Sequence, residues 1–153
     1  MAKILEKMAE KEETWIVNIV RTNFVFTAME ELKMANDNDW SSPFRVKFLG
    51  EEGIDQGGPR REFFSLLLSN FPVFEGKSFS VDSSFLINKD YNTLGKVTSL
   101  AILNGHPGPK RFGEHIVNYI LYRKEPEACV ESDIEREDVL HAIHKVILVF
   151  GLV

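Results

Sequence analysis

The chain has 153 residues, of which 44% are hydrophobic and 27% charged, the size and composition of about one soluble globular domain. Its formal net charge of −5 argues against general affinity for nucleic acid or an anionic membrane, and no apolar run reaches the roughly 20 residues that span a bilayer. A single cysteine permits no internal disulfide, which fits a reducing cytoplasmic or nuclear compartment.

The first part of the chain predicts two strands separated by a helix. Residues 1–14 are rich in charge and are expected to form a leading helix or extension. Trp15–Val20 is apolar and β-branched, and Phe44–Leu49 alternates apolar with basic side chains, so both are expected to be strands of a small β element. Between them, Phe24–Lys33 predicts a helix, and the polar cluster Asn36–Pro43 is a turn that ends it.

A glycine-rich acidic turn follows the second predicted strand. Its four glycines give the backbone freedom for tight or left-handed conformations: Gly50, Gly53, Gly57 and Gly58. We expect Gly57 or Gly58 to have a positive φ. Pro59 suits the first turn of the next helix. The buried face of that helix is predicted by apolar residues at helical spacing: Phe63, Phe64, Leu67, Leu68 and Phe71.

A glycine-rich loop between a strand and a helix is also an anion site by geometry. Here Glu51, Glu52 and Asp55 would repel a phosphate, and neither a Gly-Lys-Ser/Thr ending nor a G-x-G-x-x-G spacing is present. Nucleotide binding is therefore a weak alternative. The charged residues of the turn are expected to brace it through ion pairs and backbone hydrogen bonds: Asp55, Arg60, Arg61 and Glu62.

The middle of the chain predicts a loop, an extended segment and a helix. Phe71–Phe79 is expected to be an aromatic loop, and Ser80–Asp90 an extended polar segment anchored by Phe85 and Leu86. Asn92–Leu103 predicts a helix that ends at a strong breaker cluster, residues 104–109.

Two more helices and an apolar end are expected beyond the breaker cluster. Phe112–Arg123 predicts a helix whose buried side chains are Ile116, Val117, Ile120 and Leu121. An acidic loop over 126–131 precedes a capping box at Ser132 and Glu135, which predicts a third late helix. The apolar tail Val146–Val153 is interpreted as the end of a segment cut from a longer protein, or as a tail packed on the core or on a partner.

No catalytic, cofactor-binding or metal-binding residue is predicted. Cys129 is the only thiol, and the carboxylates around it disfavour the reactive thiolate, so it is expected to be inert. The histidines have no cysteine or carboxylate partners in register for a metal site and are expected to be solvated: His106, His115, His141 and His144.

Three segments of the chain, in order, resemble the N-terminal lobe of the HECT-type ubiquitin ligases. They are Arg21 between a strand and a helix, the string G-E-E-G-I-D-x-G-G-P-R-R-E-F-F from Gly50 to Phe64, and Tyr91-x-x-Leu94-Gly95-x5-Ala101-x2-Asn104-Gly105 with the proline-containing break after it. The resemblance covers roughly Ile16 to Leu121. Its structural motif consists of Arg21, Gly50, Glu51, Gly53, Asp55, Gly57, Gly58, Arg61, Glu62, Phe63, Phe64 and Gly95.

The resemblance implies an α+β fold, predominantly α-helical with a small β element, in which residues 15–153 form part of the HECT N-lobe. The chain would stop before the subdomain that binds the conjugating enzyme and before the catalytic C-lobe. In the full protein the implied partners are a ubiquitin-conjugating enzyme, ubiquitin and a protein substrate, and ubiquitin would pass through a cysteine thioester to substrate lysines. This segment would be scaffold without a nucleophile. The alternative is a HECT-derived domain that has lost catalysis and serves as a protein-interaction module.

Overall fold

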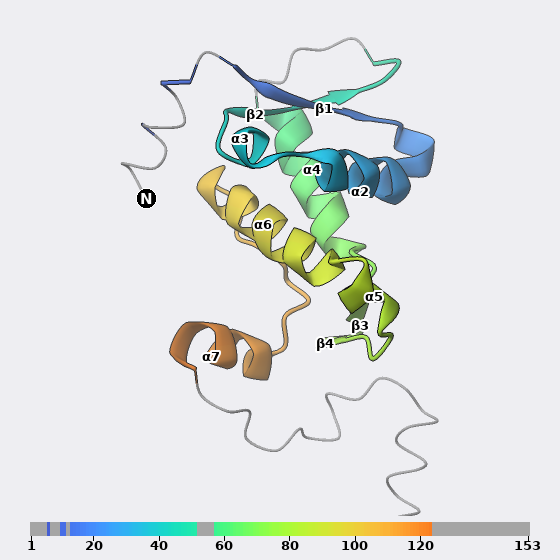
Figure 1. Cartoon of the computed structure of the whole chain (residues 1–153), viewed down its shortest axis with the longest axis vertical. Helices are drawn as coiled ribbons and strands as arrows, with labels where there is room; N and C mark the ends of the chain where they lie inside the picture. Colours follow the sequence, from blue (N-terminus) through green and yellow to red (C-terminus); the bar gives the residue numbers. More distant parts are fainter. Residues whose placement is uncertain (1–5, 7–9, 12, 52–56, 124–153) are drawn as a thin grey trace, which may run out of the picture. The chain divides into compact units, whose positions relative to one another are not determined.

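The computed structural model describes residues 6, 10–11, 13–51 and 57–123, whose helices and strands are labelled in Figure 1. The chain divides into two compact units. Unit 1 consists of Met1–Pro72 and Ser83–Lys110, and unit 2 consists of Val73–Asp82 and Arg111–Val153. The described residues are mainly helical with short strands, in agreement with the expected α+β class.

The β element of unit 1 is a parallel pair of strands. β1 (Trp15–Ile19) pairs with β2 (Phe44–Phe48), with Trp15 opposite Phe44 and Ile19 opposite Phe48. Alternate residues of both strands are buried, because the pleat sends successive side chains to opposite faces. Both predicted strands are confirmed, and the parallel direction is an addition that the sequence pattern did not specify.

A parallel pair needs a crossover connection, and here the crossover is helical. It contains the short 3-10 helix η1 (Arg21–Asn23), α2 (Phe24–Met34) and α3 (Asp37–Trp40). The predicted helix over Phe24–Lys33 is therefore confirmed as α2. In Figure 1, α2 and the helix that follows β2, α4 (Gly58–Ser69), lie on the same side of the strand pair.

Phenylalanine rings form the centre of unit 1. Phe63 and Phe64 of α4 are 0% and 1% exposed. The ring centroid of Phe44 lies 5.6 Å from that of Phe63 and 5.5 Å from that of Phe64. Phe24 meets Phe63 edge-on at 5.8 Å. Because each buried ring of this size stabilises the fold by about 1.5–3 kcal/mol, these contacts hold α4 against the strands. The predicted buried face of α4 is confirmed.

The long helix of unit 1 is α6 (Asp90–Leu103), which contains the predicted helix Asn92–Leu103. It buries Leu94, Val97, Leu100 and Ala101 and ends at the predicted breaker, where Gly105 has φ +80°. Asp90 at its start is buried and forms an ion pair of 2.8 Å with Lys33 of α2. This pair fixes the beginning of α6 against the end of α2.

The prediction of an extended segment over Ser80–Asp90 is wrong. A short helix, α5 (Ser84–Ile87), lies within it and α6 already begins at Asp90. Serine and asparagine favour such local turns, and the Asn88 N–H donates to the Ser84 carbonyl at 2.9 Å. Leu86 is expected to be anchored but is 67% exposed, because the single helical turn of α5 directs its side chain towards solvent.

Unit 2 begins with a hairpin where the aromatic loop Phe71–Phe79 is predicted. β3 (Phe74–Glu75) pairs antiparallel with β4 (Ser78–Phe79), and the rings of Phe74 and Phe79 stack at 5.7 Å. The Phe112 ring meets Phe74 edge-on at 5.6 Å. Strands of two residues are too short to show a period of two, which is why the sequence predicts only a loop here.

The helix of unit 2, α7 (Glu114–Tyr122), confirms the helix predicted over Phe112–Arg123 but not its burial. Ile116 is buried, whereas Val117, Ile120 and Leu121 are 36%, 51% and 63% exposed. The expectation that these three are buried is wrong, because helical periodicity identifies an apolar face without showing that anything covers it. Within the described ranges, no helix has the length and apolar character needed to cross a membrane.

Several predicted features lie outside the described residues. They are most of the leading helix over 1–14, the turn residues Gly53 and Asp55, Cys129, the acidic loop with the third late helix, His141 and His144, and the tail Val146–Val153.

The turn before α4 makes a prediction about stability. Gly57 has φ +104°, as expected for one of the two glycines, while Gly58 does not have a positive φ. Replacing Gly57 by Ala should lower the free energy of unfolding by on the order of 1 kcal/mol or more, because an L side chain is strained at this φ. Chemical denaturation measures the change.

Gly58→Ala is the matched control for this variant. No atom lies within 4 Å of a Cβ built on Gly58, and alanine is a better helix former. We expect the Gly58→Ala chain to be at least as stable as wild type. Equal unfolding midpoints for the two variants would contradict this account of the turn.

Candidate functional site

The charged residues of the predicted motif meet at one edge of the strand pair. Arg21 follows β1, Glu51 follows β2 and Glu62 belongs to α4. The carboxyl ends of parallel strands lie at the same edge of a sheet, and this brings the first two residues together. We call Arg21, Glu51 and Glu62 the Arg21 cluster.

Arg21 binds both carboxylates of the cluster. Its Nε and Nη2 donate to Glu51, the latter at 3.0 Å, and its Nη1 donates to Glu62 Oε1 at 2.6 Å. The guanidinium carbon also lies 4.2 Å from the centre of the Phe48 ring. A planar guanidinium can pair with two carboxylates and stack on a ring at the same time, which a lysine could not do.

The cluster changes the ionisation of its members. Hydrogen bonds to Glu51 and then to Glu62 raise the pKa of Arg21 above its ordinary value. The hydrogen bond from Arg21 lowers the pKa of the Glu51 carboxyl below its ordinary value of 4.5. The three side chains are nearly half exposed, so water screens these ion pairs and their main effect is to position the turn.

Most of the remaining described motif residues have a structural role. Gly50 has φ +85° and turns the chain out of β2, and Phe63 and Phe64 fill the core. Arg60 Nη1 donates to Asn104 Oδ1 at 2.9 Å, which links α4 to the end of α6. Arg61 is exposed. The Arg21 cluster, in which one guanidinium binds two carboxylates from different segments, supports a structural role.

His106 is held by specific contacts rather than being simply solvated as predicted. His106 Nε2 lies 3.2 Å from Ser65 Oγ, and its Nδ1 accepts a hydrogen bond from the Gly108 N–H at 3.1 Å. His115 packs close to Gly113 in unit 2. Among the residues that the structure describes, no group of three or more His, Cys, Asp or Glu is placed to hold a metal ion.

A groove between α3 and α6 is the feature that sequence reasoning missed. It has a volume of about 550 Å³. We call it the α3–α6 groove; its lining residues include Asp37, Trp40, Tyr91, Gly95, Lys96 and Ser99. Its two walls are more than fifty positions apart in the sequence, so only the fold brings them together.

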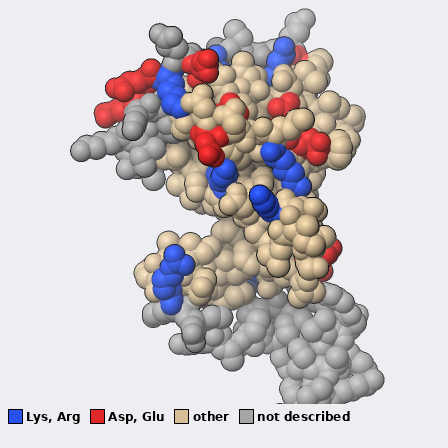
Figure 2. All heavy atoms as spheres, viewed as in Figure 1, with Lys and Arg blue, Asp and Glu red and all other residues tan. Residues whose placement is uncertain are grey.

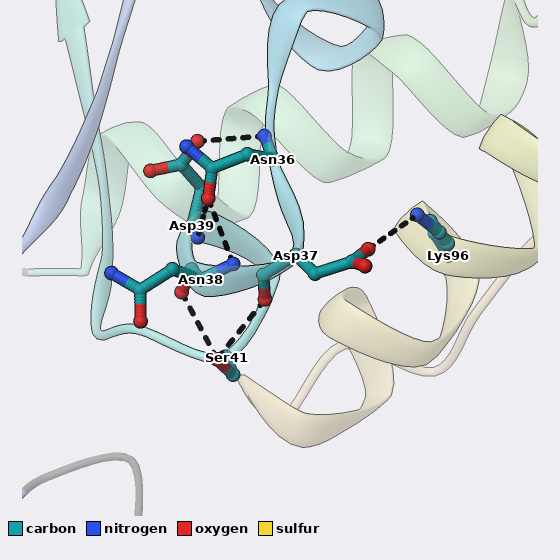
Figure 3. Close-up of polar contacts among 6 residues, drawn as sticks. All are labelled: Asn36, Asp37, Asn38, Asp39, Ser41 and Lys96. Atoms are coloured by element: carbon teal, nitrogen blue, oxygen red, sulfur yellow. Dashed lines mark hydrogen bonds and ion pairs between the residues drawn. The ribbon is translucent and has the colours of Figure 1, made fainter.

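Helix α3 forms one wall because a polar segment caps itself. The Asn36 side chain accepts from the N–H groups of Asn38 and Asp39, at 2.8 and 3.1 Å, and Asp39 Oδ2 accepts from the Asn36 N–H at 2.8 Å (Figure 3). This is a capping box, which stabilises a helix N-terminus by satisfying its free donors. The segment Asn36–Pro43, predicted as a turn, therefore contains a helical turn that ends at Trp40.

Charged and aromatic groups border the groove. Lys96 Nζ lies 3.4 Å from Asp37 Oδ1, as Figure 3 shows, and 5.4 Å from the centre of the Trp40 ring. The Trp40 ring meets the Trp15 ring of β1 edge-on, with 5.0 Å between the ring centroids, and this contact holds Trp40 in position. The groove wall is therefore attached to the strand pair.

Gly95 lies on the groove surface in the interior of α6. It does not have a positive φ, and no atom lies within 4 Å of a Cβ built on it. Neither the backbone nor the packing of this chain requires glycine there. The Ser99 hydroxyl donates back to the Gly95 carbonyl at 3.0 Å, so the short Ser99 side chain lies against the backbone. Neither Gly95 nor Ser99 therefore places a large side chain on this face of α6.

Comparisons with known proteins identify relatives of one class. The chain is 32% identical over 114 residues to the probable E3 ubiquitin-protein ligase HERC3 of Homo sapiens, a match that covers 68% of this chain and 11% of the relative. It is 28% identical over 145 residues to the G2/M phase-specific E3 ubiquitin-protein ligase of Homo sapiens, covering 89% and 20%. For the E3 ubiquitin-protein ligase RSP5 of Saccharomyces cerevisiae the identity is 26% over 102 residues, covering 58% and 13%.

The chain thus spans between 11% and 20% of the length of these relatives. No protein-family model matches it. The broader expectation from the sequence is confirmed, since the chain contains a segment related to the HECT-type E3 ubiquitin ligases.

The Arg21 cluster predicts a dependence of stability on acid. Because the folded-state pKa of Glu51 is lowered, the pair with Arg21 stabilises the fold above pH 4.5, and this stabilisation is lost as the pH falls through the lowered pKa. Wild type should therefore lose more stability than Arg21→Gln on acidification, and their unfolding midpoints should converge at low pH. Arg61→Gln is the control and should track wild type; a constant gap between Arg21→Gln and wild type would contradict the prediction.

Gly95 predicts a gain of stability. Alanine at position 95 should raise the free energy of unfolding by about 0.5–1 kcal/mol, because a glycine inside a helix loses more backbone entropy on folding than alanine does. Ser99→Ala, on the same face of α6, is the control and shows how much an alanine substitution at this face changes the free energy of unfolding by itself. A lower unfolding midpoint for Gly95→Ala would mean that the chain itself needs the glycine.

Proposed function

We propose that this chain is the scaffold part of a HECT-type ubiquitin ligase, and that residues 15–153 belong to the large subdomain of its N-terminal lobe. The observation that carries the proposal is the Arg21 cluster, in which residues from two of the three motif segments converge on one turn. The E3 ubiquitin-protein ligases that resemble the chain match it over most of its length, which supports the same reading.

In the whole protein, the proposed reaction passes ubiquitin between sulfur atoms and then to nitrogen. A cysteine thiolate outside this segment attacks the thioester that joins ubiquitin to a conjugating enzyme, and the conjugating enzyme leaves as its thiolate. A substrate lysine amine then attacks the new thioester, and an amide forms while the ligase thiolate is released. Partners are therefore the conjugating enzyme, ubiquitin and the protein substrate, in the cytoplasm or the nucleus.

The contribution of this segment is a rigid platform. Transfer requires mobile parts to meet in a defined geometry, and a fixed body limits the orientations that they sample. The parallel strands, the phenylalanine contacts of α4 and the Arg21 cluster supply such a body within unit 1. No cofactor is needed for a thioester exchange of this kind.

A second candidate function is a HECT-derived interaction module that has lost catalysis. The α3–α6 groove favours it, because its aromatic wall at Trp40 and the missing side chain at Gly95 would suit contact with another protein. The two functions make different predictions about the whole protein.

Transfer assays separate these two functions. The 153-residue chain, incubated with ubiquitin-charged conjugating enzyme, should form no thiol-sensitive adduct, because its only cysteine, Cys129, is flanked by acidic residues that disfavour the thiolate. The full-length protein from the same coding sequence should form such an adduct on a non-reducing gel. Cys129→Ala in the full-length protein should leave that adduct intact.

Two results would contradict the scaffold proposal. An adduct on the isolated chain that disappears in Cys129→Ala would make this segment a transferase itself. A full-length protein that folds but forms no adduct would leave the interaction module as the function.

A further inference from the structure

The α3–α6 groove continues around α6 into a second hollow that is bordered by lysines. This second hollow has a volume of about 320 Å³ and shares Trp40, Asn92 and Lys96 with the α3–α6 groove. Its lining adds Lys33 and Lys89. In Figure 2, Lys and Arg side chains gather over the part of unit 1 where α6 lies in Figure 1, with acidic side chains beside them.

Of the two carboxylates near these lysines, only Asp37 is a weak competitor for a partner. Lys33 is held by the buried Asp90 at 2.8 Å and is already compensated. Asp37 Oδ1 lies 3.4 Å from Lys96 Nζ, and the Asp37 side chain is fully exposed. Exposed ion pairs of this kind are easily replaced. Lys89 is exposed. The three lysines outnumber Asp37 and Asp90 by one, so this surface carries a small positive charge on a chain whose net charge is −5.

The shape of the surface favours a helix as occupant. Gly95 and Ser99 are four residues apart and lie on one face of α6, where the missing side chains let a second helix axis approach closely. Trp40 and Leu103 supply apolar contact along the same groove. Helices recognised in grooves carry apolar anchors at helical spacing and a charged flank that matches the rim.

We propose that the α3–α6 groove is a docking site for an acidic amphipathic helix of a partner protein. The helix lies across Gly95 and Ser99 with its apolar side on Trp40, and its carboxylates replace Asp37 on Lys96 and approach Lys89. This assignment explains why a glycine that the fold does not require stands on the exposed face of a long helix. It does not depend on ligase activity.

A peptide-display selection tests the assignment on the intact chain. Random 16-residue peptides are selected on the wild-type chain and counter-selected on Gly95→Leu, whose side chain fills the groove from a position where the chain itself has open space. We expect the recovered peptides to have apolar residues at helical spacing and an excess of Asp and Glu. Thermal unfolding must show that Gly95→Leu is folded, as expected for a good helix former.

Synthetic versions of the recovered peptides then report on the charges, with tryptophan fluorescence of the chain as one readout. Lys96→Gln should weaken binding by about threefold to tenfold, and Asp37→Asn should strengthen it, because the competing carboxylate is gone. Raising the salt concentration should weaken binding to wild type. If Asp37 had only a structural role, Asp37→Asn would weaken binding, as Lys96→Gln does.

Three outcomes would overturn the proposal. The first is that no peptide depends on Gly95, and the second is that the dependent peptides are basic, uncharged or rich in proline. The third is a concentration-dependent dimer of the wild-type chain, seen by sedimentation, that Gly95→Leu dissociates. That result would make a second copy of this chain the occupant of the groove.

Discussion

The parallel pairing of β1 with β2 is the constraint on which unit 1 depends. Two strands that run in the same direction cannot be joined by a tight turn, so the chain between them must cross over, and here it forms α2 and α3 on its way. The same direction puts the ends of both strands at one edge, where Arg21 meets Glu51. The Arg21 cluster and the α3 wall of the groove both follow from the pairing.

The motif around α4 divides its work between apolar and charged residues. Phe63 and Phe64 remove large rings from water and contribute most of the stability that this motif can supply. The Arg21 cluster is exposed to water and adds little energy, but a guanidinium between two carboxylates has few alternative geometries. Burial therefore holds α4 in place, while the charges determine how the chain enters it.

The sequence predicts the elements that have a clear period or a clear break. The alternation in Phe44–Leu49, the helical spacing of Phe63 to Leu68 and the breaker after Leu103 all correspond to observed elements. α5 and the β3–β4 hairpin are missed because elements of two to four residues are shorter than any period that could reveal them.

The candidate site is less predictable, because it depends on contacts between distant segments. The motif includes Arg21, Glu51 and Glu62, yet the sequence does not show that one arginine binds both carboxylates. The groove is hidden for the same reason, since α3 and α6 meet only in the fold. The self-capping of α3 was readable in principle, because Asn36 and Asp39 have the spacing of a capping box.

The edge-on contact of Trp15 and Trp40 also gives the molecule an internal optical reporter. These are the two tryptophans of the chain, and both belong to unit 1. Tryptophan emission therefore follows the unfolding of unit 1 alone, while Tyr119 and Tyr122 of α7 absorb in unit 2. Whether the two units unfold as one cooperative body or in sequence can be read from the unmodified protein, by comparing its emission with the loss of helical circular dichroism.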